Sequence, residues 1–187
     1  MKLDRETEEK VKTEAINYLK NGKPNWDIPH TLVSVDWMRK LIKDEGGNER
    51  ILVTAMYLHD IGYPKLEKGY NFDDMMQAKK GHAEAGAERA EKVLKKLKYS
   101  DSEIKEIVYL VGSHYNKDNI DTPNRQLVIE ADGLAKIDWE RVTPNFDKRN
   151  TAKYFEYFKG RTVPKFRTKT GIRFLKELLQ KAENYLK

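Results

Sequence analysis

The spacing of apolar residues is the feature that most constrains the fold of this chain. Along much of the 187-residue sequence, apolar side chains recur every three or four positions, as at Val11, Ala15 and Leu19. This period places them on one face of an α-helix, whereas a half-buried strand would alternate every second residue. The run ILVTAMYL at 51–58 is compatible with a buried strand, but its neighbours have helical spacing. We therefore expect an all-α fold of about seven or eight helices.

Capping signals mark where several of these helices begin. Ser100 and Glu103 have the spacing of a capping box, and Thr122 precedes a proline at the first position of another helix. Asn48 can cap the helix that contains the 51–58 run, and Asp27 can cap the helix before it. Between the helices, residues 63–79 read as an irregular stretch rich in Gly, Asp and Tyr. A loop of this length in a compact domain is often an active-site lid.

No internal repeat or flexible linker divides the chain, so we expect one domain over residues 1–187. No apolar segment approaches the ~20 residues that a membrane-spanning helix requires, and the charged N-terminus does not fit a signal peptide. The sequence contains no cysteine, which excludes disulfides, thiolate metal ligands and cysteine nucleophiles. We therefore expect a cytoplasmic protein without a membrane partner, in which any metal is bound by His, Asp or Glu.

The four histidines each lie near an end of an expected helix, where convergent helix ends could bring them to one cavity. Taken singly, each has an ordinary explanation; His114, for example, could bind the last carbonyls of its helix. The adjacent pair His59-Asp60 is harder to explain. Neighbouring helical side chains point about 100° apart, but both can reach one ion beyond the helix end. A cation there would also remove the unfavourable interaction of Asp60 with the helix dipole.

Asp132 is a second carboxylate that needs a partner. It lies among apolar residues in the segment 129–134, and a buried carboxylate is costly when it is unpaired. A salt bridge to Lys136 or Arg125 would satisfy it, and so would a metal ion.

At this point the sequence resembles the HD-domain superfamily of metal-dependent phosphohydrolases. The resemblance rests on the ordered segments PHTLVSVDWMRKLI, YLHDIGYP and EADGLAKID, and it spans residues 25–140. The segments KKGHAEAGAERAEKVL and EIVYLVGSHYN match the positions at which members with two metals carry two further histidines. The C-terminal segment FRTKTGIRFLKELLQKAENYL also looks like the closing helix of family members of similar length.

The resemblance implies a ligand set and a mechanism. The implied metal ligands are His30, His59, Asp60, His82, His114 and Asp132. Asp60 would be the catalytic carboxylate that bridges two ions, with His30, His59 and Asp132 at one ion and the other two histidines at the second. The ions would be one or two divalent metals among Mn, Fe, Ni, Co and Mg. A water activated by the metals would then attack phosphorus.

The candidate substrate contacts are basic. Family members often carry Lys directly after HDIG, whereas here Tyr63 stands at that position and Lys65 follows two residues later. Residues 148–176 contain ten Lys or Arg against one acid, in a chain whose net charge is +6. This basic C-terminal extension, about 145–187, is either a solvated face or a segment that folds beside the metals. In the second case Arg161, Lys165 and Arg167 would bind substrate phosphate.

The function predicted from the sequence is hydrolysis of a phosphate ester or anhydride in a nucleotide or another small phosphorylated metabolite. One alternative is a di-iron oxygenase, because relatives with this ligand set activate dioxygen. Another is a non-catalytic module, stabilised by metal, that binds nucleic acid or protein, although the complete ligand set argues against it. The substrate, the native metal and the oligomeric state are left open by the sequence.

Overall fold

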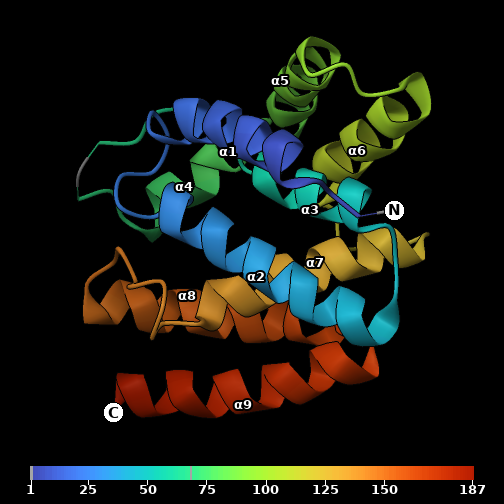
Figure 1. The fold of residues 1–187 in the computed structure, drawn as a ribbon. Coiled ribbons are helices and arrows are strands. Elements are labelled where there is room, and N and C mark those ends of the chain that lie inside the picture. Colours follow the sequence, from blue (N-terminus) through green and yellow to red (C-terminus); the bar gives the residue numbers. More distant parts are fainter. Residues whose placement is uncertain (1, 68) are drawn as a thin grey trace.

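A computed structural model describes residues 2–67 and 69–187 of the chain (Figure 1). Within these residues there are nine α-helices, one short 3-10 helix and no strand, so the predicted all-α class is confirmed. The α-helices are α1 Arg5–Leu19, α2 Asp27–Glu45, α3 Glu49–Leu58, α4 Phe72–Ala78, α5 His82–Lys96, α6 Asp101–Ser113, α7 Pro123–Ile137, α8 Lys148–Arg161 and α9 Lys169–Leu186, and the 3-10 helix η1 is Val163–Lys165.

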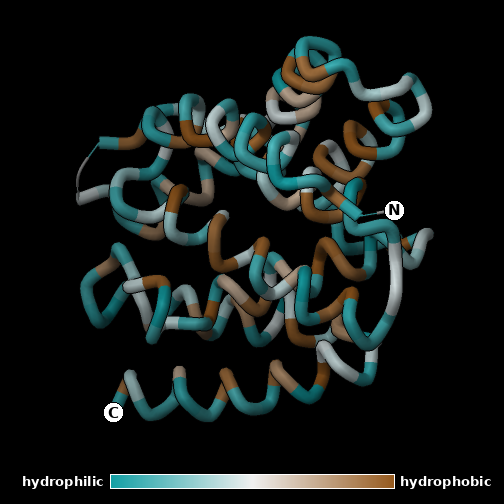
Figure 2. The backbone as a smooth tube through the Cα atoms, in the orientation of Figure 1, coloured by the Kyte–Doolittle hydropathy of each residue, from teal (hydrophilic) through white to brown (hydrophobic). Residues whose placement is uncertain are grey.

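Helices α2 and α7 pack against each other in the middle of the molecule (Figure 1). Helix α3 packs on α2, α6 and α1, while α5 and α6 form an antiparallel pair and α9 covers the outer side of α7. Hydrophobic residues recur at intervals along α9 (Figure 2), and its Leu175, Leu178 and Ala182 are buried in the core. Among the described residues, no helix is both long enough and apolar enough to cross a membrane.

Most of the predicted helix starts are confirmed. Asn48 caps α3, Ser100 and Glu103 form the capping box of α6, and Thr122 caps α7. The prediction for Asp27 is wrong. Trp26 occupies the cap position of α2, and the Asp27 carboxylate is buried, where it accepts a 2.6 Å hydrogen bond from the backbone N–H of Lys23.

The stretch 63–79 is less irregular than expected, because it contains the seven-residue helix α4. A capping box between Asn71 and Asp74, which the sequence reading overlooked, starts this helix. Aromatic residues of the stretch 63–79 hold it against neighbouring elements, and Phe72 belongs to a small apolar cluster with Met75 and Tyr154. The Phe72 ring lies 6.5 Å from that of Tyr154 on α8, and the buried Tyr63 ring stacks on His82 at 4.2 Å. Helix α4 therefore rests against α8.

Candidate metal centre

The six side chains predicted to bind metal meet at one place inside the molecule, although they come from five helices. His30 lies in the first turn of α2, His59 and Asp60 follow α3, His82 begins α5, His114 follows α6, and Asp132 lies in the middle of α7. Each is at most 3% exposed. Helix ends that point inward thus bring five of the six residues together, as the positions of the histidines in the sequence suggested.

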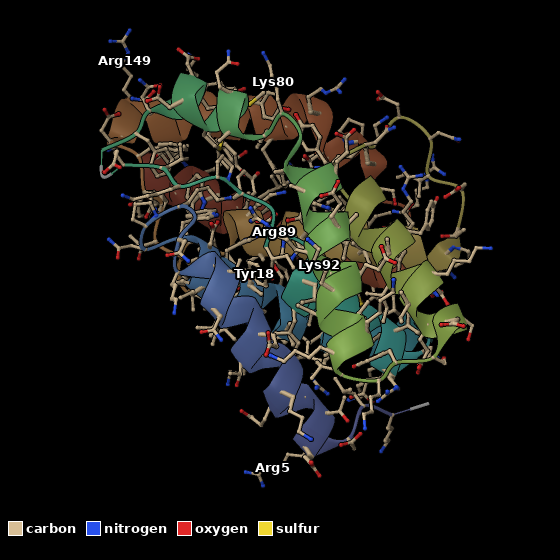
Figure 3. All side chains as sticks on the ribbon, turned by 90° about the horizontal axis from the view of Figure 1, so that it is seen from above. Arg5, Tyr18, Lys80, Arg89, Lys92 and Arg149 are labelled. Atoms are coloured by element: carbon tan, nitrogen blue, oxygen red, sulfur yellow. The ribbon has the colours of Figure 1, made fainter. Side chains whose placement is uncertain are left out.

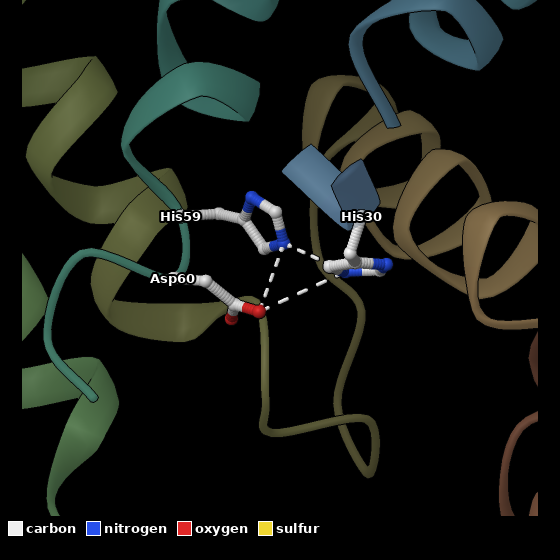
Figure 4. A group of neighbouring side chains, drawn as sticks. All are labelled: His30, His59 and Asp60. Atoms are coloured by element: carbon white, nitrogen blue, oxygen red, sulfur yellow. Dashed lines mark hydrogen bonds and ion pairs between the residues drawn. The ribbon is translucent and has the colours of Figure 1, made fainter. Parts of the chain in front are cut away.

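A first set of donor atoms is formed by His30, His59, Asp60 and Asp132. The two imidazole Nε2 atoms are 3.3 Å apart, and Asp60 Oδ2 lies 3.7 Å from His30 Nε2 and 3.5 Å from His59 Nε2 (Figure 4). Asp132 Oδ1 lies 3.1 Å from His30 Nε2 and 3.5 Å from His59 Nε2. Four donor atoms therefore surround one small volume.

A second set lies on the other side of Asp60. His82 Nε2 and His114 Nε2 are 3.2 Å apart, and Asp60 Oδ1 is 3.9 Å from the first and 3.5 Å from the second. Asp60 therefore turns one carboxylate oxygen toward each set. This is the arrangement that a carboxylate bridging two ions would require.

Backbone carbonyls orient three of the four imidazoles. The Nδ1–H groups of His59, His82 and His114 donate to the carbonyl oxygen three residues earlier, at 2.6–2.7 Å. A neutral imidazole that donates from Nδ1 has its lone pair on Nε2, and this outer hydrogen bond is typical of metal-binding histidine. Paired Nε2 lone pairs would repel each other unless a proton or a metal ion lay between them.

The spacing of the donor atoms fits a metal ion. Ligands about 2.1 Å from an ion lie about 3.0 Å apart at right angles and about 3.4 Å apart in a tetrahedron. The separations in both sets, 3.1–3.9 Å, fall near these values. Imidazole and carboxylate donors suit divalent first-row metals, so the residues fit one ion in each set.

The charge state of the centre is consistent with cation binding. Although burial acts to raise the pKa of Asp60, His59 and Lys23 hold it well below its usual value. Burial acts to lower the pKa of His59, but the neighbouring carboxylates of Asp60 and Asp132 raise it overall. Burial lowers the pKa of His82 to about 3 and that of His30 to about 4. The field at the centre therefore favours a positive charge between His59 and the two carboxylates, and leaves His82 and His30 neutral.

Two residues outside the donor sets fix the segment that follows Asp60. Gly62 packs against α5 so closely that a Cβ there would lie 1.9 Å from the carbonyl oxygen of His82. Arg89 of α5 donates a 2.5 Å hydrogen bond to the carbonyl oxygen of Ile61, and its guanidinium lies 5.6 Å from the ring of Tyr18. Figure 3 shows Arg89 and Tyr18 near each other between α5 and α1. The absence of a side chain at Gly62 thus allows His82 to approach Asp60.

Two lysines contact the carboxylates of the centre. Lys136 donates from Nζ to Asp132 Oδ2, while the other oxygen of Asp132 faces the histidines. The salt bridge and the first donor set therefore use different oxygens of one carboxylate. Lys23 Nζ lies 3.5 Å from Asp60 Oδ2 and 2.9 Å from Asp27 Oδ1, and it sits 3.4 Å above the ring of Tyr63.

A cavity of about 240 Å³ lies beside the centre, and we call it the cationic pocket. Its charged lining consists of Lys79, Lys117, Lys136 and Arg161, with one acid, Asp118. Lys79, Lys117 and Lys136 are three or four residues along the chain from His82, His114 and Asp132, respectively. Three of the pocket's cations therefore stand close in the chain to candidate ligands, while Tyr154, Tyr157, Phe158 and Arg161 of α8 form another wall.

The predicted substrate-binding residues separate in the structure. Arg161 lines the cationic pocket, and Lys165 approaches its rim, where both side chains lie 3.8–3.9 Å from Asp118. Lys65 is exposed and pairs with Glu67 at 3.1 Å. Arg167 is exposed and is not among the residues that line the pocket; its backbone N–H donates to the buried Glu130. Arg161 and Lys165 are therefore at the cationic pocket or its edge, while the other two are not.

Sequence reasoning missed Lys23, Lys79 and Lys117, and it considered Lys136 only as a salt-bridge partner. A signal existed for three of them. Lys136 follows Asp132 by one helical turn, and Lys79 and Lys117 stand three residues from a predicted histidine ligand. Lys23 had no local signal, because only the packing of the segment before α2 brings it to Asp60.

Comparison with known proteins agrees with this geometry. A model of the HD domain matches residues 28–137. Among solved structures, the fold is similar to a crystal structure described as a predicted HD superfamily hydrolase from an uncultured Thermotogales bacterium, with a TM-score of 0.62 and 20% sequence identity. The alignment covers 97% of this chain and 88% of that chain. A search of curated proteins found no match. The family model spans more than half of the sequence and includes all six candidate ligands, so the chain belongs to the HD-domain family.

Proposed function

We propose that this protein is a metal-dependent phosphohydrolase that cleaves a phosphate ester or anhydride of a nucleotide or another small phosphorylated metabolite. The observation that carries the proposal is the pair of donor sets that share Asp60, next to a pocket lined by cations. Divalent ions held there would lower the pKa of a water molecule and neutralise phosphoryl oxygens.

The protein's own residues have defined roles in this proposal. Asp60 contributes one oxygen to each set, and the Nδ1–H hydrogen bonds of His59, His82 and His114 keep the Nε2 atoms directed inward. Lys136 neutralises the outer oxygen of Asp132. The positive pocket draws an anionic substrate to the centre, because a cleft of one sign concentrates ligands of the opposite sign.

The test couples metal analysis to a panel of phosphomonoesters, nucleotides and phosphodiesters, with Mn²⁺, Fe²⁺, Co²⁺, Ni²⁺ and Mg²⁺ added back separately. We expect phosphate release that requires a metal and is lost in Asp60→Asn, whose helical content should stay unchanged. The assay should be run with and without oxygen. Iron-dependent oxygen consumption without phosphate release would contradict the proposal and favour a di-iron oxygenase, and failure to bind any of the metals would refute it outright.

A further inference from the structure

The charges of the cationic pocket are not balanced by the residues that line it. Lys79 is 6% exposed and faces the rings of Tyr115, Tyr154 and Tyr157 at 5.2–5.9 Å. Lys117 Nζ donates a 2.8 Å hydrogen bond to the hydroxyl of Thr162. Within the described residues, neither ammonium has a carboxylate at salt-bridge distance. Asp118, the one acid of the lining, lies near Arg161 and Lys165 instead.

Such an arrangement is unfavourable without an anion. Burial and the charges of Lys136 and Lys117 hold the pKa of Lys79 well below its usual range. Burial, followed by the charge of Lys136, lowers the pKa of Lys117 to about 7. Buried ammonium groups that repel one another cost free energy in folding, and a bound dianion would offset that cost.

The pocket has the size and position for one more small anionic group. Lys136 lines the cavity of about 240 Å³ and also donates to Asp132, so one side chain separates the cavity from the candidate metal centre. A second cavity shares Lys79, Lys136 and Tyr154 with it but measures only about 20 Å³, room for about one water molecule. It is walled by aromatic residues such as Trp26 and Phe146. A large apolar or nucleobase group therefore has no space there.

We propose that the cationic pocket binds a second phosphoryl group, so that the substrates are compact molecules with two neighbouring phosphates, such as diphosphates. This rests on the proposed function, in which the reacting phosphoryl lies at the metal centre. Lys79, Lys117 and Arg161 bind the other phosphoryl. Arg161 suits bidentate contact with phosphate oxygens, and the two lysines supply compact point charges. The pocket thereby selects substrates by the phosphate that is not cleaved.

The experiment measures binding to the metal-loaded protein with two probes, inorganic phosphate and methylenediphosphonate, which carries two phosphoryl groups and has no cleavable P–O–P bond. Isothermal titration should give tighter binding of the diphosphonate than of phosphate. In the variants Lys117→Gln and Arg161→Gln the diphosphonate Kd should rise about ten- to a hundredfold, as expected for a lost charge-assisted hydrogen bond. The phosphate Kd should change much less.

Lys159→Gln is the matched control, because Lys159 belongs to the same helix as Arg161 but pairs with Glu156 and is absent from the pocket lining. It should bind both probes as the wild type does. The inference would be overturned if Lys117→Gln and Arg161→Gln lost affinity equally for phosphate and diphosphonate, or lost affinity for neither. A measurement on the wild type alone gives a second test: kcat/KM should be higher for a diphosphate ester than for the monophosphate ester of the same alcohol, and equal values would also overturn it.

Failure of this inference can be told apart from failure of the proposed function. Metal-dependent cleavage of monophosphates with no role for Lys117 or Arg161 would leave the phosphohydrolase standing and remove the second phosphate site. Conversely, pocket-dependent diphosphonate binding without hydrolysis of any ester or anhydride would retain the site and reject the reaction.

Discussion

Replacement of Gly62 by alanine tests directly how the close approach of α5 builds the second donor set. The new Cβ would lie 1.9 Å from the carbonyl oxygen of His82 and 2.4 Å from the backbone N of Gly86, whereas ordinary contact begins at 3.4 Å. The start of α5 must therefore retreat by about 1.5 Å, the difference between 3.4 and 1.9 Å. Metal–ligand distances tolerate only about 0.2 Å, so His82 Nε2 would leave the second donor set.

We expect Gly62→Ala to lose the ion held by His82 and His114 and to keep the ion of the first set. Overpacking typically costs about 1–3 kcal/mol. For a chain of this size a cost of about 2 kcal/mol lowers the Tm by about 4–8 °C. Elemental analysis after anaerobic Mn²⁺ loading gives the stoichiometry, and thermal denaturation in chelator gives the stability without the metal contribution.

Gly112→Ala is the control, since its Cβ would meet Ala87 at an ordinary 3.4 Å. It should keep the wild-type metal content and Tm. A Gly62→Ala protein with wild-type stoichiometry and wild-type Tm would refute the reasoning, because α5 would then not be held against residues 59–62 as closely as the structure shows.

Four further outcomes follow from the site and its supports. Chelation should lower the Tm of the wild type and metal should restore it, because an ion bound only by the folded chain stabilises that chain; an unchanged Tm would argue against a metal centre. His114→Ala should lose one of two ions by elemental analysis, and loss of both or neither would contradict the division into two sets. Glu130→Ala should lower the free energy of unfolding in urea by about 2–4 kcal/mol with metal content intact, because the buried carboxylate accepts hydrogen bonds from Gln126, Arg167 and Thr168. Burial lowers the pKa of Lys117 to about 7, helped by the charges of Lys136, Arg161 and Lys165 and opposed by Asp132. This ammonium is therefore charged below pH 7 and neutral above it. Diphosphonate binding should therefore weaken as pH rises above about 7, by up to about tenfold per pH unit. This decline should be absent in Lys117→Gln. A wild-type Kd that does not change with pH would show that Lys117 does not contact the anion.

The basic segment 148–176 shows where sequence patterning stops being informative. Its local charge of +9 left two possibilities open, a solvated face or a segment that folds beside the metals. In the structure its charges are divided among separate partners: Lys153 pairs with Asp73, Lys159 with Glu156, and Arg173 with Asp44. Among the described basic residues of this segment, Arg161 lines the cationic pocket and Lys165 lies 3.8 Å from Asp118 at its edge, whereas Arg167 is exposed and does not line it.

The sequence by itself determined the helices and most of their starting points, because the apolar period and the capping residues act within one or two turns. The start of α2 is the exception, since the buried Asp27 is engaged by Lys23 rather than by the helix N-terminus. The resemblance to the HD-domain superfamily indicated the six candidate ligands, because the ordered His and Asp segments match the family pattern.

Only the tertiary structure decided which oxygen of Asp60 faces which pair of histidines, and which cations surround the centre. His30 and Asp132 are 102 residues apart in the sequence yet 3.1 Å apart in space. Local propensity contains no information on such pairs. The approach of Gly62 to α5 and the gathering of Lys79, Lys117 and Arg161 around one cavity depend on how whole helices pack, and that packing minimises the free energy of all the buried surfaces together rather than of any one segment.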